Sequence, residues 1–176
     1  LRLPGCVDPF EQGVRAILGQ LVSVAMAAKL TAKVAQRYGD VLDERGFICF
    51  PTPQQLSAAQ VGDLQTLGMP RKRAESLIYL AQAACDGLLP LTAPVDVEQG
   101  VKALQTFPGI GRWTASYFAL RGWQAKDIFL PDDYLIKQRF AGMTPAQTRR
   151  YAERWQPWRS YALLHIWYTA GWGPEV

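Results

Sequence analysis

One stretch decides the fold: Leu104-Gln105-Thr106-Phe107-Pro108-Gly109-Ile110-Gly111-Arg112-Trp113-Thr114-Ala115. Two glycines flank one apolar residue between two segments of helical pattern, and glycine permits positive φ and a close backbone approach. We expect Ile110 to be buried between the two helices. The N–H groups of Gly109 and Gly111 then point outward where the second helix starts, and helix N-termini favour anions. The hydroxyl of Thr114 would be one more donor.

The same turn has two simpler interpretations. A Pro-Gly turn often does no more than join two helices. It could also hold a nucleotide phosphate, but the patterns G-x-G-x-x-G and G-x-x-x-x-G-K-[ST] are absent. The wider pattern is more specific, because Leu104 and Phe107 precede the turn and Thr114-Ala115 follows it. This arrangement resembles the helix–hairpin–helix element that binds the DNA backbone.

Helix-start signals recur along the rest of the chain. Asp8-Pro9-Phe10-Glu11 and Thr52-Pro53-Gln54-Gln55 each combine a capping residue, a proline and a capping-box partner. Strand signals are poor, and only Phe47–Phe50 and Ile128–Leu130 are short candidates. We therefore predict one mostly α domain over residues 1–176, with Pro90–Pro94 as the crossover between two helical halves. The expected helices begin at or near Asp8, Ser23, Thr52, Val61, Pro70, Asp96, Arg112, Pro131, Thr144 and Trp158.

Charge and aromatic residues gather in the second part of the chain. The 176 residues carry a net charge of +4, of which residues 1–99 contribute −1 and residues 100–176 contribute +5. All six tryptophans lie in the second part. A basic, aromatic-rich segment suits a polyanion with flat rings to stack on, although a solvated basic face beside an aromatic core has the same composition.

Several kinds of chemistry are poorly supported. No apolar run approaches the roughly 18 residues that a membrane span needs. One histidine and three separated cysteines argue against a protein zinc site, an iron–sulfur cluster or a His-based triad. We expect Cys6, Cys49 and Cys85 to be small buried hydrophobes, and His165 to be a packed structural residue.

A carboxylate pair lies beyond the turn, in Leu130-Pro131-Asp132-Asp133-Tyr134. An acid at a helix start is most simply a cap. A hairpin followed by such an Asp, however, resembles the helix–hairpin–helix superfamily of base-excision DNA glycosylases, whose two helical halves flank the active-site cleft. The likeness extends over most of the chain to its 3-methyladenine DNA glycosylase II family, through 10–23 and 155–172. Members also carry an N-terminal α/β domain, of which this sequence shows no trace, so we expect a part of a longer protein.

The resemblance assigns roles to individual residues. The catalytic Asp falls on Asp133, and Asp132 is read as capping or structural. Leu21 takes the place of the wedge that fills the space of a flipped base, and Gln20 that of a contact to the opened pair. Bifunctional relatives have a lysine nucleophile where Trp113 stands, so no Schiff base forms there. The implied base pocket is aromatic: Trp113, Tyr117, Trp167 and Tyr168.

The resemblance thus implies a monofunctional glycosylase acting on double-stranded DNA. It would flip alkylated bases such as 3-methyladenine and 7-methylguanine and hydrolyse the N-glycosidic bond, with the Asp stabilising an oxocarbenium-like transition state. No cofactor is required, but the carbonyls of Gln105, Phe107 and Ile110 are candidate ligands for Na⁺ or K⁺. We expect a bacterial, cytoplasmic monomer with no membrane partner. The alternative is a non-catalytic DNA-binding module, which would need neither Asp133 nor the wedge.

Overall fold

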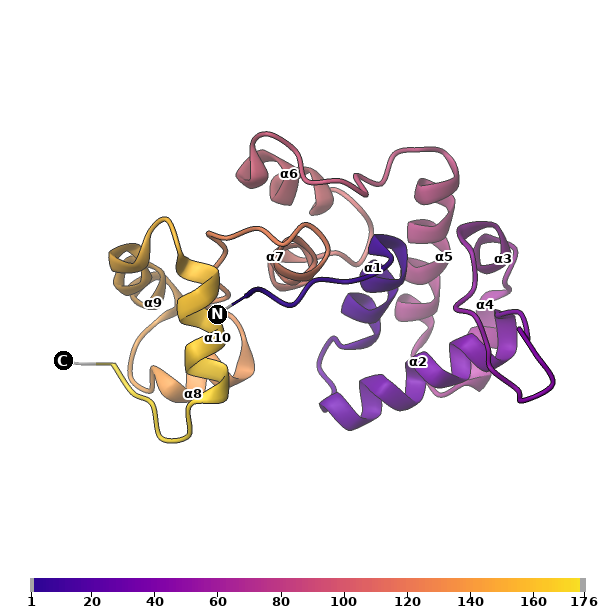
Figure 1. Cartoon of the computed structure of the whole chain (residues 1–176), viewed down its shortest axis with the longest axis horizontal. Coiled ribbons are helices and arrows are strands. Elements are labelled where there is room, and N and C mark those ends of the chain that lie inside the picture. The colour runs from indigo at the N-terminus through magenta and orange to yellow at the C-terminus, as the bar shows by residue number, and fades with distance from the viewer. Residues whose placement is uncertain (1, 175–176) are drawn as a thin grey trace.

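The computed structural model describes residues 2–174, and within them the chain is helical (Figure 1). The helices alternate with short turns, and one 3-10 turn follows α9. Their bounds are α1 (Pro9–Leu18), α2 (Val24–Tyr38), α3 (Pro53–Ser57), α4 (Val61–Thr66), α5 (Arg71–Cys85), α6 (Val97–Leu104), α7 (Arg112–Arg121), α8 (Tyr134–Arg139), α9 (Pro145–Ala152), η1 (Glu153–Trp155) and α10 (Arg159–Tyr168).

Side-chain caps confirm several of the predicted helix starts, whereas the helix expected from Pro131 begins at Tyr134. Asp8 accepts a hydrogen bond from the N–H of Phe10, and Asp96 accepts one from Gln99. Thr52 and Thr144 each form a complete capping box. These caps satisfy N–H groups that have no partner inside the helix, so they fix where each helix begins.

The two strand candidates are not strands. Over residues 2–174 the only β-type pairing is an isolated antiparallel bridge between Val41 and Ile48. Ile128–Leu130 pairs with no neighbouring strand. Runs of three or four apolar residues are too short to form a sheet alone, and no partner strand lies beside them.

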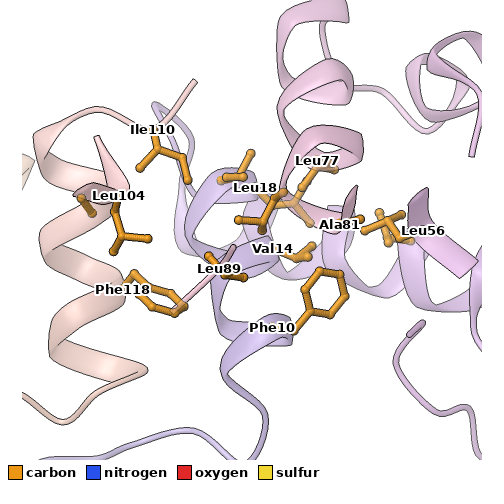
Figure 2. Packing of buried hydrophobic residues seen from close by; sticks show 14 of the residues in the cluster. Phe10, Val14, Leu18, Leu56, Leu77, Ala81, Leu89, Leu104, Ile110 and Phe118 are labelled. Carbon is orange, nitrogen blue, oxygen red and sulfur yellow. The ribbon is translucent and has the colours of Figure 1, made fainter. Parts of the chain in front are cut away.

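The first hydrophobic core surrounds α1. Figure 2 shows Phe10, Val14 and Leu18 of α1 between Leu77 on α5 and Phe118 on α7. The same core takes in the apolar faces of α2, α3, α4 and α6. α1 is thus the central helix of one half of the molecule (Figure 1).

A second, aromatic core joins α8, α9 and α10. Its buried residues include Ile136, Phe140 and Leu163, and Trp155 packs against them. α7 belongs to both cores, because Ala115 lies in the first and Leu120 in the second. The helix that follows the hairpin is therefore the joint between the two halves.

The crossover was misplaced by the sequence reasoning. The segment with Pro90–Pro94 leads from α5 to α6, yet Leu89 and Leu104 on either side of it both pack into the first core. The chain passes into the second core through α7 and residues 122–133. Burial of Leu104 keeps α6 with the first half.

The cysteines also differ from expectation. All three are free thiols, but Cys49 and Cys85 are exposed and Cys6 is only half-buried. None belongs to either core, so they do not act as small buried hydrophobes. Among residues 2–174, no helix has the length and hydropathy of a membrane span.

Candidate functional site

The hairpin between α6 and α7 presents unpaired N–H groups. Ile110 is 8% exposed and donates its own N–H to the Phe107 carbonyl at 3.0 Å, which confirms the predicted burial. The N–H groups of Gly109 and Gly111 donate to no residue within 2–174. Gly111 is the N-cap of α7 and offers no side-chain acceptor. Free N–H groups at a helix N-terminus form an anion site.

The two hairpin glycines serve different purposes. Gly109 has a φ of 77°, and a Cβ there would lie 1.9 Å from the Oγ of Ser76 on α5. Gly111 has an ordinary φ of −83°, and a Cβ there would meet no atom within 4 Å. Gly109 is therefore required by the packing of the hairpin on α5, whereas Gly111 leaves open space through which a ligand can approach.

Two of the three carbonyls predicted to bind a cation have no hydrogen-bond donor among the described residues. The carbonyls of Gln105 and Ile110 accept no hydrogen bond from the described residues, and that of Phe107 accepts one. Neutral carbonyl oxygens are ligands for hard cations. A monovalent cation at these three groups, holding a phosphate against the hairpin, stays a prediction.

The wedge candidate stands clear of the core. Leu21 is fully exposed and has a φ of 55°, which is uncommon for a residue with a Cβ. A core position, which residue type alone would favour, is therefore wrong for this leucine. Its exposed apolar side chain is instead available to contact a bound molecule.

Gln20 points toward the hairpin. Its Nε2 donates to the carbonyl of Gly109 at 2.8 Å and to the Oγ1 of Thr114 at 2.9 Å. Both amide hydrogens are used, so a contact of Gln20 to an opened base pair would go through its carbonyl oxygen. Thr114 is 4% exposed. Its hydroxyl oxygen accepts this internal bond, and the donation of its O–H to a phosphate stays a prediction.

The carboxylate of Asp133 receives four hydrogen bonds. Its Oδ1 accepts from the N–H groups of Leu135 (3.1 Å) and Ile136 (3.3 Å), and from the Nε1 of Trp167 (3.1 Å). Its Oδ2 accepts from the Nε1 of Trp113 (3.0 Å). The cap of α8 is thus Asp133, and the capping role expected of Asp132 is wrong.

This arrangement fixes an anion without neutralising it. Four donors hold the carboxylate in one orientation, and bonds to a charged acceptor are strong. No cation pairs with Asp133 among residues 2–174. Oδ2 has a single partner, so it is the oxygen with room for another contact.

Three of the four predicted pocket residues gather at this carboxylate. The rings of Trp113 and Tyr117 stack at 5.0 Å with 6° between their planes. The Tyr117 ring lies 6.4 Å from that of Trp167. Tyr168 is 75% exposed and its ring contacts none of the three. Trp113 and Trp167 therefore act as hydrogen-bond donors as well as rings, which the sequence did not indicate.

Sequence reasoning missed Arg121. Its guanidinium carbon lies 5.9 Å from the ring centre of Tyr117 and 5.8 Å from that of Trp167. The spacing of four residues from Tyr117 on one helix could have indicated this contact. A cation at these rings adds to the electrostatics of the site.

Two hollows of the described residues lie away from the carboxylate. In the described part of the chain, a cavity of about 10 Å³ lies between α1 and α7, and a hollow of about 520 Å³ lies along α9. Neither is lined by Asp133 or by the stacked rings. Asp133 and the rings of Trp113, Tyr117 and Trp167 are each partly exposed.

His165 does not take part in the site. It lies on α10, and its side chain is exposed between the buried Leu164 and Ile166. The packed structural role predicted for it is wrong, because its face of the helix points away from the second core.

Comparisons with known proteins identify the family of this chain. Residues 14–159 match the model of the HhH-GPD superfamily of base excision DNA repair proteins. The chain therefore belongs to this superfamily. The match contains the hairpin, the wedge candidate and Asp133, and it ends at the first residue of α10.

Individual relatives within this superfamily are similar to the chain over most of its length. The chain is 78% identical over 176 residues to DNA-3-methyladenine glycosylase 2 of Escherichia coli, covering 99% of this chain and 62% of that protein. It thus spans less than two thirds of the relative's length. Among solved structures, a 3-methyladenine DNA-glycosylase from Archaeoglobus fulgidus has a TM-score of 0.77 at 27% identity, with 94% of this chain and 60% of that one covered. A Schizosaccharomyces pombe 3-methyladenine DNA glycosylase in complex with abasic DNA shares the fold, with a TM-score of 0.76 at 22% identity over 95% and 82% of the two chains.

Proposed function

We propose that this chain is the catalytic part of a monofunctional DNA glycosylase that removes alkylated bases from double-stranded DNA. The observation that carries the proposal is the carboxylate of Asp133, held by two indole N–H groups beside stacked rings. Its similarity to the E. coli glycosylase supports the same reaction class.

The aromatic residues select the substrate by charge and stacking. A purine methylated at a ring nitrogen carries a positive charge, and cations are attracted to the faces of aromatic rings. Trp113 and Trp167 bring such rings next to an anionic group, and Tyr117 stacks on Trp113. The base would lie among these rings after leaving the duplex.

The chemistry is the hydrolysis of a C1′–N bond. A cationic base is a good leaving group, so it departs with the bonding electron pair and without a proton from the protein. Positive charge then develops on the deoxyribose, and Oδ2 of Asp133 stabilises it. Water adds to C1′ and releases a proton, which leaves an abasic site. Trp113 stands where a lyase needs its lysine, so the DNA strand stays intact.

The hairpin and Leu21, the wedge, make the contacts to the DNA. The N–H groups of Gly109 and Gly111 bind a backbone phosphate, with a monovalent cation at the carbonyls of Gln105, Phe107 and Ile110. Leu21 fills the space that the flipped nucleotide leaves. These contacts are independent of base sequence, as a search for damage requires.

The test is to incubate the chain with methylated duplex DNA and to separate the free bases and the strands. We expect released 3-methyladenine and 7-methylguanine, an intact strand with abasic sites, and no covalent adduct after borohydride. Binding without base release would favour the non-catalytic module. A trapped adduct would contradict the monofunctional mechanism.

A further inference from the structure

The backbone at Leu21 is held in an unfavourable conformation by its surroundings. Its φ of 55° lies in the left-handed region, which residues with a Cβ rarely adopt. The side chain is fully exposed, so packing of Leu21 itself does not explain the conformation. Such a conformation persists only where neighbouring contacts over-determine it, and it is often found at functional sites.

Two sets of hydrogen bonds hold Gln20, the residue before Leu21. The side chain is bound by the hairpin, through the carbonyl of Gly109 and the hydroxyl of Thr114. The main chain is bound from α5, because Nη2 of Arg73 donates to the Gln20 carbonyl at 2.5 Å. Gln20 is thus fixed at both ends, and the peptide that leads into Leu21 is one of the fixed groups.

Arg73 is an unusual residue for a purely structural role. It is half-buried, and its Nε is buried without a hydrogen-bond partner among the described residues. No carboxylate within residues 2–174 pairs with it, and burial lowers the pKa of its guanidinium. A half-buried cation without a counter-charge is unfavourable for folding. Arg71, on the same helix, is exposed and pairs with Glu75.

The same face of α5 supports the hairpin. Ser76 lies three residues after Arg73, and its Oγ occupies the space that a side chain at position 109 would need. Residues at this spacing share one face of a helix. α5 therefore contacts the wedge loop, residues 19–22, and the hairpin from one surface.

We propose that Arg73 is a positioning residue for base flipping, which fixes the wedge loop against the hairpin so that Leu21 and the phosphate-binding N–H groups meet the DNA as one rigid unit. This proposal rests on the proposed function. Its advantage is physical: a wedge ordered before binding loses little conformational freedom when it enters the duplex.

The experiment compares Arg73→Met with Arg71→Met, the matched control on α5. Base release is measured on methylated duplex and on methylated single-stranded DNA, where no paired base has to be opened. We expect Arg73→Met to lose about tenfold on the duplex and less than twofold on the single strand, Arg73→Lys to recover part of the loss, and Arg71→Met to match the wild type. An equal loss on both substrates, or none on the duplex, would overturn the proposal.

A second readout separates this proposal from the proposed function. A 2-aminopurine next to an abasic site in a duplex becomes fluorescent as it unstacks, and the signal needs no catalysis. We expect a smaller rise with Arg73→Met, and no further decrease when Arg73→Met is added to Leu21→Ala, because both changes act on one element. Additive decreases would overturn the positioning role. A normal signal from a wild type that releases no base would count against the proposed function alone.

Discussion

The hairpin and the carboxylate are the two regions of the proposed site, and they are built in different ways. The hairpin is local: residues 104–115 contain both glycines, the buried Ile110 and the start of α7. The carboxylate is assembled over long distances, because the donors to Asp133 include Trp113 and Trp167, which lie 20 and 34 residues away.

The difference shows which interactions produce the free N–H groups of the hairpin and which produce the hydrogen bonds to Asp133. The proposed anion site of the hairpin follows from backbone geometry, because the glycines and the helix start leave N–H groups without a partner. The setting of Asp133 depends on how α7 and α10 pack around the start of α8. Changes in the first region should alter DNA binding, and changes in the second should alter the chemical step.

The largest effect is expected at Asp133. Asp133→Asn removes the negative charge that we propose stabilises the developing cation, so base release should fall by about 10² or more. DNA binding should remain, because a carboxylate does not attract phosphate. Single-turnover release from methylated DNA measures the effect, and Asp132→Asn is the control, expected to stay near the wild type. A larger loss for Asp132→Asn would move the catalytic role to that residue.

Substitution of the two hairpin glycines should distinguish effects on folding from effects on DNA binding. Gly111→Ala places a methyl group in open space, so the melting temperature should stay unchanged. DNA affinity should fall about tenfold, the scale of one lost hydrogen bond to a charged group at about 1.5–3 kcal/mol. Gly109→Ala should lower the melting temperature as well, since its methyl group would meet Ser76. Equal affinity of Gly111→Ala and the wild type would remove this hairpin from the DNA interface.

Replacing the tryptophans by phenylalanine tests the ring and the N–H group separately. Trp113→Phe and Trp167→Phe keep an aromatic face but each remove one donor to Asp133. We expect roughly tenfold slower base release, again from one lost bond to a charged group. The preference for 7-methylguanine over neutral hypoxanthine should persist, because the rings remain. A lost preference with an unchanged rate would show that the N–H groups are not what positions Asp133.

The smallest effect on activity is expected at Asp127 and Arg159. Two side-chain bonds of 2.7 and 2.8 Å join them at the start of α10. Burial raises the pKa of the Asp127 carboxyl, but the hydrogen bonds and charge of Arg159 outweigh it, so the pKa lies below its usual value. The stabilisation is therefore full above about pH 4 and is lost as the pH falls below it.

Asp127→Asn should destabilise the protein by about 1–2 kcal/mol at neutral pH, the scale of a charge-assisted bond at a partly exposed site. Thermal unfolding at pH 7 and pH 3 measures this, and the variant should approach the wild type at the lower pH. Per folded molecule, base release should be unchanged. A variant equally destabilised at both pH values would show that packing, and not charge, is the cause.

The sequence indicated the helices well because their signals are local. Caps at Asp8, Ser23, Thr52 and Thr144 each involve a few consecutive residues. The hairpin was readable for the same reason. The assignment of Asp133 came from family resemblance, since either acid of the pair could have been the cap.

What the sequence could not indicate depends on residues that meet only in the folded chain. The indole N–H bonds to Asp133 need α7 and α10 in place, and the bond from Arg73 to Gln20 spans 53 residues. The exposure of His165 and of Tyr168 follows from which face of α10 meets the second core. Residue type alone suggested the reverse for His165.

The central claim is that the hairpin binds DNA whereas Asp133 acts in the chemical step. The most direct test measures DNA affinity and single-turnover base release for Asp133→Asn, Gly111→Ala and the double variant. We predict that Asp133→Asn changes only the rate of bound enzyme, that Gly111→Ala changes only the affinity, and that the double variant shows both losses in full. A Gly111→Ala enzyme that binds normally but reacts slowly, or a double variant with less than the combined loss, would contradict the account.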